Sequence, residues 1–232
     1  MLFEADSVAG CVCDPTALRY PAGKNMKSTT SPGTTLKKIH YLSGITLSLF
    51  IGFHLYNHLF ALAGPAGHIA LMAQLRKVYR HPVVETLLLL AVLTQVVSGV
   101  KLLFNRKKKI IAEQLQVYSG IYLSLFLTIH VAAVIAGRQI EHLDTNFYFA
   151  GAGLNIYPAT LFFIPYYFFA VAAIGLHLAA LHYLKTRSRW SAYLIGSVGI
   201  AISVLILLGY TNFFRWREMP LEYRAFTEKY FG

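Results

Sequence analysis

Residues 40–63 read HYLSGITLSLFIGFHLYNHLFALA and contain no Asp, Glu, Lys or Arg. The hydrocarbon core of a membrane is about 30 Å thick and a helix rises about 1.5 Å per residue, so about 20 mostly apolar residues can cross it. Four further stretches of this kind follow, at 83–104, 117–137, 159–184 and 190–214. The sequence therefore predicts an all-α fold, an integral membrane bundle of five helices.

Composition also indicates a membrane protein. Of the 232 residues, 56% are hydrophobic and 13% are charged, whereas soluble domains usually carry about 25% charged residues. The net charge is +11, and in so apolar a chain this favours charged loops at a lipid surface over a nucleic-acid partner. The two cysteines, Cys11 and Cys13, lie outside the apolar stretches and indicate neither a disulfide framework nor a cysteine-based metal cluster.

Lys and Arg are distributed unevenly between the two sides of the membrane. If the N-terminus lies inside, 13 of the 21 Lys and Arg residues fall on the inner side, and the run Arg106–Lys109 contributes most to this bias. The positive-inside rule then predicts that the N-terminus is inside and, after five spans, that the C-terminus is outside. Arg76, Lys77 and Arg80 oppose this orientation. The expected location of this multi-pass chain is the bacterial inner membrane.

The predicted domain organisation has three parts. We expect 1–36 to be a disordered N-terminal segment, 37–214 to be the five-helix transmembrane domain, and 215–232 to be a short extracytoplasmic tail. Met26 precedes a polar stretch that leads into the first span. We therefore expect translation to start at Met26, which would make 1–25 a wrongly assigned start.

The nine histidines fall into two groups. Five lie at the ends of the spans or in loops, where an imidazole is expected to be solvated or interfacial: His40, His68, His81, His142 and His182. The other four, His54, His58, His130 and His177, lie inside apolar stretches. Polar side chains are costly there and are usually functional. For any one of them alone, a hydrogen bond between helices is an equally good explanation.

Two of these histidines are predicted to lie at the same depth. His54 is 14 residues from the inner end of its span and His130 is 13 residues from the inner end of its own, so both lie roughly 20 Å above the inner boundary. Bis-histidine haem ligation requires two imidazoles at one depth on different helices, since each presents a nitrogen to one face of the iron. The small residues Gly52, Ala132 and Ala133 would let the macrocycle approach.

A second pair of matched depth lies nearer the inner side. His177 and Gln95 are about seven and nine residues from the inner ends of their spans, which corresponds to roughly 11–14 Å. An amide is not a usual haem ligand, so this level has one good ligand. His54 and His58 share a helical face, but the sequence lacks the clustered histidine pairs of membrane hydroxylases. We expect His58 to meet a haem propionate or the headgroup region.

Four groups of residues carry a family resemblance, which covers about 38–185: His54–Asn57 with Gly64-Pro65, Pro82 with 99–106, Ser119-Gly120 with His130, and Gly175–His177. In this order they resemble the five-helix cytochrome b subunit of succinate dehydrogenase and fumarate reductase. That subunit is a single-chain, typically dihaem membrane anchor of bacteria. The fifth span agrees with it only in kind.

The resemblance implies a set of haem ligands. Carried over by position, they fall on His54, Gln95, His130 and His177, with His54 and His130 holding the outer haem and Gln95 and His177 the inner one. The metal ligands are then His54, His130 and His177. One haem b is expected, and the departure at Gln95 leaves the second haem without its other imidazole.

The resemblance also implies an electron-transfer subunit with no catalytic residue of its own. It would connect a cytoplasmic iron–sulfur subunit and flavoprotein to membrane quinone. The basic inner face suits docking of these partners, although the positive-inside rule explains the same charges equally well. Candidate contacts to quinone are Glu85, Glu141 and Asp144 on the outer side and Gln95 or Lys101 on the inner side. Two alternatives stay open: a haem-free five-helix structural or transport protein, and a b-type cytochrome serving another dehydrogenase.

Overall fold

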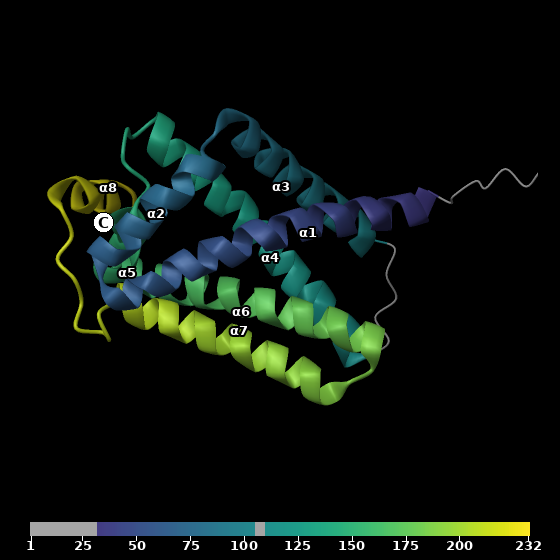
Figure 1. The fold of residues 1–232 in the computed structure, drawn as a ribbon. Coiled ribbons are helices and arrows are strands. Elements are labelled where there is room, and N and C mark those ends of the chain that lie inside the picture. Colours follow the sequence, from purple (N-terminus) through teal and green to yellow (C-terminus); the bar gives the residue numbers. More distant parts are fainter. Residues whose placement is uncertain (1–31, 105–109) are drawn as a thin grey trace, which may run out of the picture. The chain divides into compact units, whose positions relative to one another are not determined.

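The computed structural model describes residues 32–104 and 110–232. In these residues all regular structure is helical, which confirms the predicted all-α class. Eight α-helices follow one another along the chain (Figure 1): α1 (Pro32–Leu59), α2 (Pro65–Tyr79), α3 (Pro82–Leu103), α4 (Ile111–Gln139), α5 (Phe147–Asn155), α6 (Ala159–Thr186), α7 (Arg189–Tyr210) and α8 (Leu221–Phe231). A 3₁₀ turn, Phe60–Ala63, extends α1.

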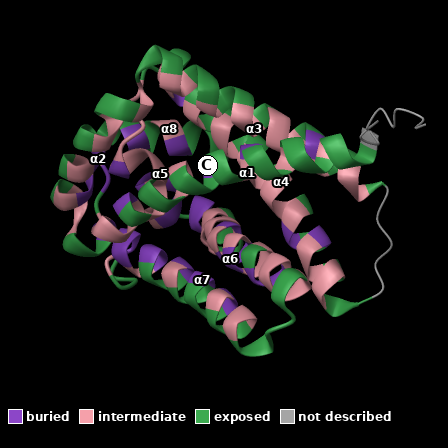
Figure 2. Ribbon diagram, turned by 45° about the vertical axis from the view of Figure 1, so that its right-hand side comes forward, coloured by how far each residue is buried: buried purple, intermediate pink, exposed green. Residues whose placement is uncertain are grey.

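Five of these helices are long and apolar enough to cross a membrane: α1 with its 3₁₀ extension, α3, α4, α6 and α7. This confirms the five predicted spans, and the protein is a multi-pass membrane protein. Large apolar side chains are exposed on the outer faces of the spans. More than half of the residue surface is exposed at Leu42, Leu49, Leu93 and Leu125. Figure 2 shows how exposed residues follow the helices. Such a surface suits contact with lipid rather than water.

The first helix begins earlier than predicted. α1 starts at Pro32, so 32–36, which we expected to be disordered, form its first turn. Proline is favoured at the start of a helix because its φ is already near the helical value and its missing N–H would have no intrahelical acceptor there. The rest of the expected N-terminal segment, including Met26, lies outside the described residues, as does the basic run Arg106–Lys109.

The five spanning helices form a ring. Each packs against two others, in the order α1, α3, α4, α6, α7, and α7 returns to α1. The backbones of α6 and α7 touch at Gly175 and Gly199, where a Cβ added to Gly175 would lie 2.7 Å from Gly199 Cα. Within the described residues, helices on opposite sides of the ring, such as α1 and α4, are not packed backbone to backbone. Side chains therefore meet across the interior of the ring.

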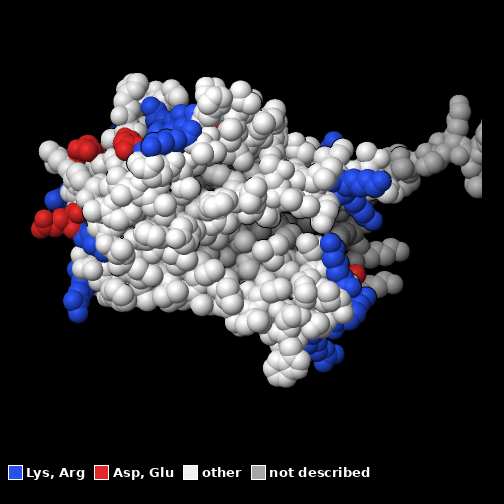
Figure 3. Space-filling model, viewed as in Figure 1, with Lys and Arg blue, Asp and Glu red and all other residues white. Residues whose placement is uncertain are grey.

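The seam between α7 and α1 is closed at one end of the ring. Gly209 lies against the turn after α1, where an added Cβ would be 2.7 Å from Leu62 N. From this contact the two helices diverge toward the other end (Figure 1). Figure 3 shows a hollow in the surface on that side of the molecule.

Three short helices cover the end at which α7 meets α1, which we call the capped end. α2, α5 and α8 gather there (Figure 1), and α5 packs against both of the others. Their contacts bury Phe147, Leu154 and Tyr210 in one cluster and Met219 and Tyr223 in another. Helices this short cannot cross a membrane, and most of their stability comes from packing, so hydropathy did not reveal them.

Charge distinguishes the two ends of the ring (Figure 3). At the end where α1 begins, the described charges are one carboxylate, Glu113, and six cations: Lys37, Lys38, Lys101, Lys185, Arg187 and Arg189. We call this the cation-rich end. The capped end carries six carboxylates among eight Lys and Arg residues. The cation-rich end is the one predicted to face inside.

Candidate functional site

His54 of α1 and His130 of α4 face each other across the interior of the ring. Their ring centroids are 6.0 Å apart and their planes are inclined at 66°. Each imidazole stacks on an aromatic ring one turn earlier in its own helix. Phe50 lies 5.5 Å from His54, and Phe126 lies 5.2 Å from His130. Residues four apart share one face of a helix, so each helix orients its own histidine.

The spacing of this pair suits one iron atom between the imidazoles. A metal–imidazole bond is about 2 Å long, so two rings on opposite sides of an iron have centroids roughly 6 Å apart. Both histidines are only half-buried although they point into the ring, and no described residue hydrogen-bonds the His130 imidazole. In the described part of the chain no three His, Cys, Asp or Glu side chains are grouped to hold a metal ion. Two imidazoles do not complete the coordination of an iron, so an iron here would need a macrocycle to supply its other ligands.

The room for a macrocycle does not come from Gly52. This residue lies on the exposed face of α1, where an added Cβ would meet nothing within 4 Å. Two positions along a helix correspond to about 200° of rotation, so Gly52 points away from His54. Ala132 and Ala133 are also exposed. Gly52 therefore opens no space beside His54, contrary to our expectation.

A chain of hydrogen bonds leads from His54 toward the capped end. His54 Nε2 and His58 Nε2 are 3.0 Å apart, and His58 Nδ1 is 2.7 Å from the hydroxyl of Tyr210 on α7. The same hydroxyl is 3.0 Å from His68 Nε2 on α2. A neutral imidazole has one donor and one acceptor nitrogen, and a hydroxyl is both, so every contact in this chain can be satisfied at once. Such a chain can pass a proton along its length.

His68 is buried, contrary to our interpretation of it as a solvated loop residue. It is 1% exposed because α2 docks on the ring and turns this side chain inward. Burial, and to a smaller extent Arg76, lowers its pKa from 6.5 to about 4, so the imidazole is neutral at pH 7. Asn57 Nδ2 lies 3.2 Å from His68 Nε2, whereas His68 Nδ1 and Asn57 Oδ1 have no hydrogen-bond partner among the described residues.

The inner level is divided between two pairs of neighbouring helices. Ser43 Oγ donates to Gln95 Oε1 over 2.6 Å, and Gln95 Nε2 is 3.2 Å from His40 Nε2, which ties α1 to α3. His177 Nδ1 donates to the carbonyl of Gln116 over 3.1 Å, which ties α6 to α4. No hydrogen bond joins Gln95 to His177 in the described part of the chain.

The inner histidines differ in what they can bind. His40, which we expected to be solvated or interfacial, is held between Gln95 and Ser98, whose hydroxyl is 2.9 Å from His40 Nδ1. Since a carbonyl only accepts, the contact with Gln116 requires the proton of His177 on Nδ1, and the Ser119 hydroxyl lies 3.1 Å from the same nitrogen. Metal-binding histidines commonly have this arrangement, with the other ring N–H donated to a backbone carbonyl. At the inner level, His177 therefore has the tautomer that suits a metal ligand. The Gln95 amide is hydrogen-bonded to Ser43 and His40 of α1.

Two of the outer carboxylates proposed to serve quinone are engaged by arginines. Arg138 Nη1 lies 2.5 Å from Glu85 Oε1, and Arg76 Nη1 lies 2.7 Å from Asp144 Oδ1. Both pairs lie at the capped end, at the ends of α2, α3 and α4. Glu85 therefore links α3 to α4, and Asp144 links the loop after α4 to α2.

The third outer carboxylate, Glu141, binds α8. It accepts hydrogen bonds from the hydroxyl of Tyr230 and from Lys229, and these bonds lower the pKa of Glu141 below its usual value. A carboxylate of lowered pKa is ionised at neutral pH and is a poor proton donor. Lys101, one of the two inner candidates, is exposed near the end of α3, and Gln95, the other, is hydrogen-bonded to α1.

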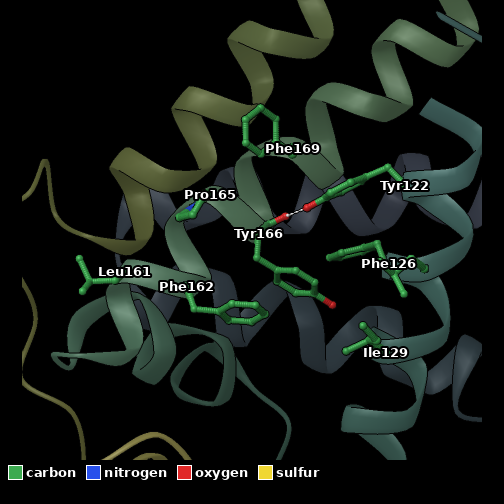
Figure 4. Close-up of a pocket in the computed structure, with 9 residues that line it drawn as sticks. Tyr122, Phe126, Ile129, Leu161, Phe162, Pro165, Tyr166 and Phe169 are labelled. Carbon is green, nitrogen blue, oxygen red and sulfur yellow. Dashed lines mark hydrogen bonds between the residues drawn. The ribbon is translucent and has the colours of Figure 1, made fainter. Parts of the chain in front are cut away.

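A cavity of about 330 Å³ lies between α4 and α6, on the lipid-facing side of the ring, and its walls are mostly aromatic and aliphatic (Figure 4). Tyr122 donates its hydroxyl to the carbonyl of Tyr166 over 2.9 Å. The Tyr166 hydroxyl points toward Phe126 and Ile129 and has no partner among the described residues. Phe126 also stacks on His130, so a single side chain separates the cavity from the histidine pair.

The histidine pair and the hydrogen-bonded chain thus lie inside the ring, and the cavity adjoins the pair from the lipid-facing side, through Phe126. The pair can bind an iron held in a macrocycle, the chain can move a proton, and the cavity can take an apolar ligand from the lipid. Comparison of the chain with protein-family models, with curated proteins and with solved structures returns no match.

Proposed function

We propose that the protein is a haem b-binding membrane anchor of a succinate:quinone oxidoreductase-like complex in the bacterial inner membrane. The observation that carries this proposal is the pairing of His54 and His130, whose ring centroids lie 6.0 Å apart inside the ring of helices. Bound haem b supplies a one-electron carrier. His54 and His130 would hold its iron, and Phe50 and Phe126 stack on the two imidazoles and orient them.

The distribution of charge supports docking of partners on one side. In this proposal the cation-rich end faces the cytoplasm, so that the N-terminus is inside and the C-terminus outside. An iron–sulfur subunit and a flavoprotein dock there, steered by the lysines and arginines of that end. The chain itself relays electrons and has no catalytic residue.

Membrane quinone is the proposed electron partner within the lipid. The cavity between α4 and α6 supports this part of the proposal because its walls are apolar and its rim is open to lipid. The Tyr166 hydroxyl can donate to a quinone carbonyl. Phe126 lines the cavity and stacks on His130, so it offers a short path for an electron.

We further propose one haem b per chain. The outer level provides two imidazoles that face each other. At the inner level, His177 is hydrogen-bonded to α4 and Gln95 to α1, each with a neighbouring helix. That division supports a single, outer haem.

The test is the dithionite-reduced minus oxidised absorbance spectrum of the purified protein, with haem quantified per chain. We expect one haem b in the wild type and near-complete loss in His54→Ala and His130→Ala. The matched control is His182→Ala, because that imidazole lies near the cation-rich end and is hydrogen-bonded to Ser191 over 2.8 Å. It should retain its haem. Protein that lacks haem after purification from cells able to supply it overturns the proposal.

A haem-free structural or transport protein is the second candidate function. The hydrogen-bonded chain from His54 to His68 favours it, because such a chain suits a proton relay. The two functions compete for His54 Nε2, which cannot bind iron and His58 at once. His58→Gln separates them: haem content stays unchanged under the first function, whereas proton movement into proteoliposomes falls under the second. A b-type cytochrome of another dehydrogenase is distinguished by the subunits that copurify.

A further inference from the structure

Three arginines gather at the capped end, where α2 and α4 end. Arg76 and Arg80 come from the last turn of α2 and its C-terminal cap, and Arg138 from the last turn of α4. They are close enough for Arg76 and Arg138 to lower the pKa of Arg80, after the larger effect of its burial. Two carboxylates lie among them, Asp144 beside Arg76 and Glu85 beside Arg138. The group therefore has an excess of positive charge.

Arg76 is only partly paired. Its Nη1 lies 2.7 Å from Asp144 Oδ1, but its Nε and Nη2 are buried and have no hydrogen-bond partner among the described residues. A guanidinium does not lose its proton in proteins, so both groups remain donors. Leaving charged donors buried without an acceptor is unfavourable, and native structures rarely do so without a reason.

The two unpaired groups form one edge of the guanidinium. Nε–H and Nη2–H lie on the same side of the planar group and point in parallel, so they match the two oxygens of one carboxylate or phosphate. Asp144 binds Nη1 with one oxygen, and its other oxygen accepts from Asn146 Nδ2 over 3.1 Å. The edge of Arg76 is therefore shaped for a second oxyanion.

Other unpaired polar atoms lie in the same part of the molecule. Of the five buried side-chain atoms without a partner in the described part of the chain, four belong to Asn57, His68 and Arg76, on α1 and α2. Arg76 is two turns beyond His68 on α2, and Arg138 is two turns beyond His130 on α4, or about 12 Å in each case. Arg138 thus lies between His130 and the capped end, and Arg76 lies as far from His68 along α2.

We propose that the Nε/Nη2 edge of Arg76 binds a buried oxyanion, a carboxylate or phosphate group, and that Arg80 and Arg138 supply the surrounding positive charge. Two sources have this chemistry. One is a propionate of a haem held by His54 and His130, and this source rests on the proposed function. The other is a phosphate, from a bound lipid or from solution, and this source does not.

The experiment compares the full chain in detergent with two variants. Arg76→Lys keeps the charge and removes the paired N–H edge. The matched control is Lys77→Gln, which removes a charge from the next position, where Lys77 is exposed and donates to Gln74. Haem retained against apomyoglobin, and phosphorus per chain after exhaustive detergent exchange, are measured for all three proteins. In addition, wild-type protein is reconstituted with haem or with haem dimethyl ester, which lacks the carboxylates.

A propionate at Arg76 predicts that haem retention falls several-fold in Arg76→Lys but not in Lys77→Gln, and that the wild type binds the dimethyl ester several-fold more weakly than haem. A phosphate predicts one phosphorus per wild-type chain, lost in Arg76→Lys, with haem unchanged. Equal affinity for haem and its ester, with no retained phosphorus, overturns the proposal even if Arg76→Lys does not fold.

The failure of this proposal and that of the proposed function give different results. Wild-type protein without haem that retains a phosphorus sensitive to Arg76→Lys overturns the haem function and leaves the oxyanion site. Protein that contains haem, binds haem and its dimethyl ester equally and retains no phosphorus has the opposite meaning. It leaves the haem function standing and overturns the oxyanion site.

Discussion

The outer and inner polar levels of the ring contain similar residues that are joined in different ways. At the outer level, His54 and His130 face each other from α1 and α4, which are not neighbours in the ring. At the inner level, Gln95 is hydrogen-bonded to α1 and His177 to α4, each with the helix beside it. A polar side chain directed at an adjacent helix links the two helices, whereas a pair directed across the ring can enclose a ligand.

The difference shows that equal depth does not by itself make a site. Depth follows from the 1.5 Å rise of a helix, and both levels satisfy it. The helix that a side chain faces depends on its angle about the helix axis and on which helices pack together. The outer pair meets this second condition, and the inner pair of His177 and Gln95 has its polar atoms engaged elsewhere.

The largest expected effect tests the two levels directly. His54→Ala and His130→Ala should each reduce haem to near zero per chain, because one remaining imidazole holds the iron from one face only. His177→Ala should keep most of the wild-type haem. The pyridine haemochrome of each purified variant measures this. Equal loss in all three variants would show that both levels bind haem and would remove the distinction between them.

The next effect in size belongs to His68, beside the outer level. Since burial lowers its pKa from 6.5 to about 4, the unfolded chain binds the proton more tightly than the folded protein. The contribution of His68 to the free energy of unfolding should be fully present above pH 6.5. It should fall by about 3 kcal/mol in all as the pH drops from 6.5 to 4. Thermal unfolding in detergent between pH 7.5 and 4.5 measures this. His68→Gln should lack this component, and parallel profiles for the two proteins would contradict it.

A smaller effect is expected at the inner level. Gln95→Leu removes the hydrogen bonds of Gln95 to Ser43 and His40 and leaves their polar groups to find other partners. The free energy of unfolding should fall by about 1–3 kcal/mol, with haem content unchanged. Denaturant unfolding and the reduced spectrum of the same sample measure both. If the variant loses its haem, Gln95 belongs to the cofactor site and is not only a link between helices.

The smallest effect is expected at Glu141, on the surface of the cap. Hydrogen bonds from Tyr230 and Lys229 lower the pKa of Glu141 from 4.5. Its contribution to stability should therefore be present above pH 4.5 and be lost as the pH falls through the lower folded value. Glu141→Gln should unfold at a slightly lower temperature than the wild type at pH 7, and at the same temperature in strong acid. A difference that grows on acidification would contradict this sign.

Local rules account for the features that the sequence could predict. Hydropathy located the five spans, and the helical rise predicted that His54 and His130 lie at one depth, since both are properties of a single segment. The environments of His68 and Tyr210 depend on how α2 and α7 dock against α1, so no local pattern marks them. The pairing of Gln95 with His40 likewise depends on the packing of α1 on α3. The short helices of the cap were missed because tertiary contacts stabilise them.

The contact of Gly209 with Leu62 has a mechanical consequence. It fixes α7 to α1 at the capped end, and the two helices diverge from there (Figure 1). α7 has 22 residues and is about 33 Å long, so a tilt of about 5° around this pivot displaces its far end by about 3 Å. A force applied to α7 at the cation-rich end would therefore act about 33 Å from this contact. His54 lies much nearer to this contact, about 12 Å away along α1, and would move less than the far end of α7.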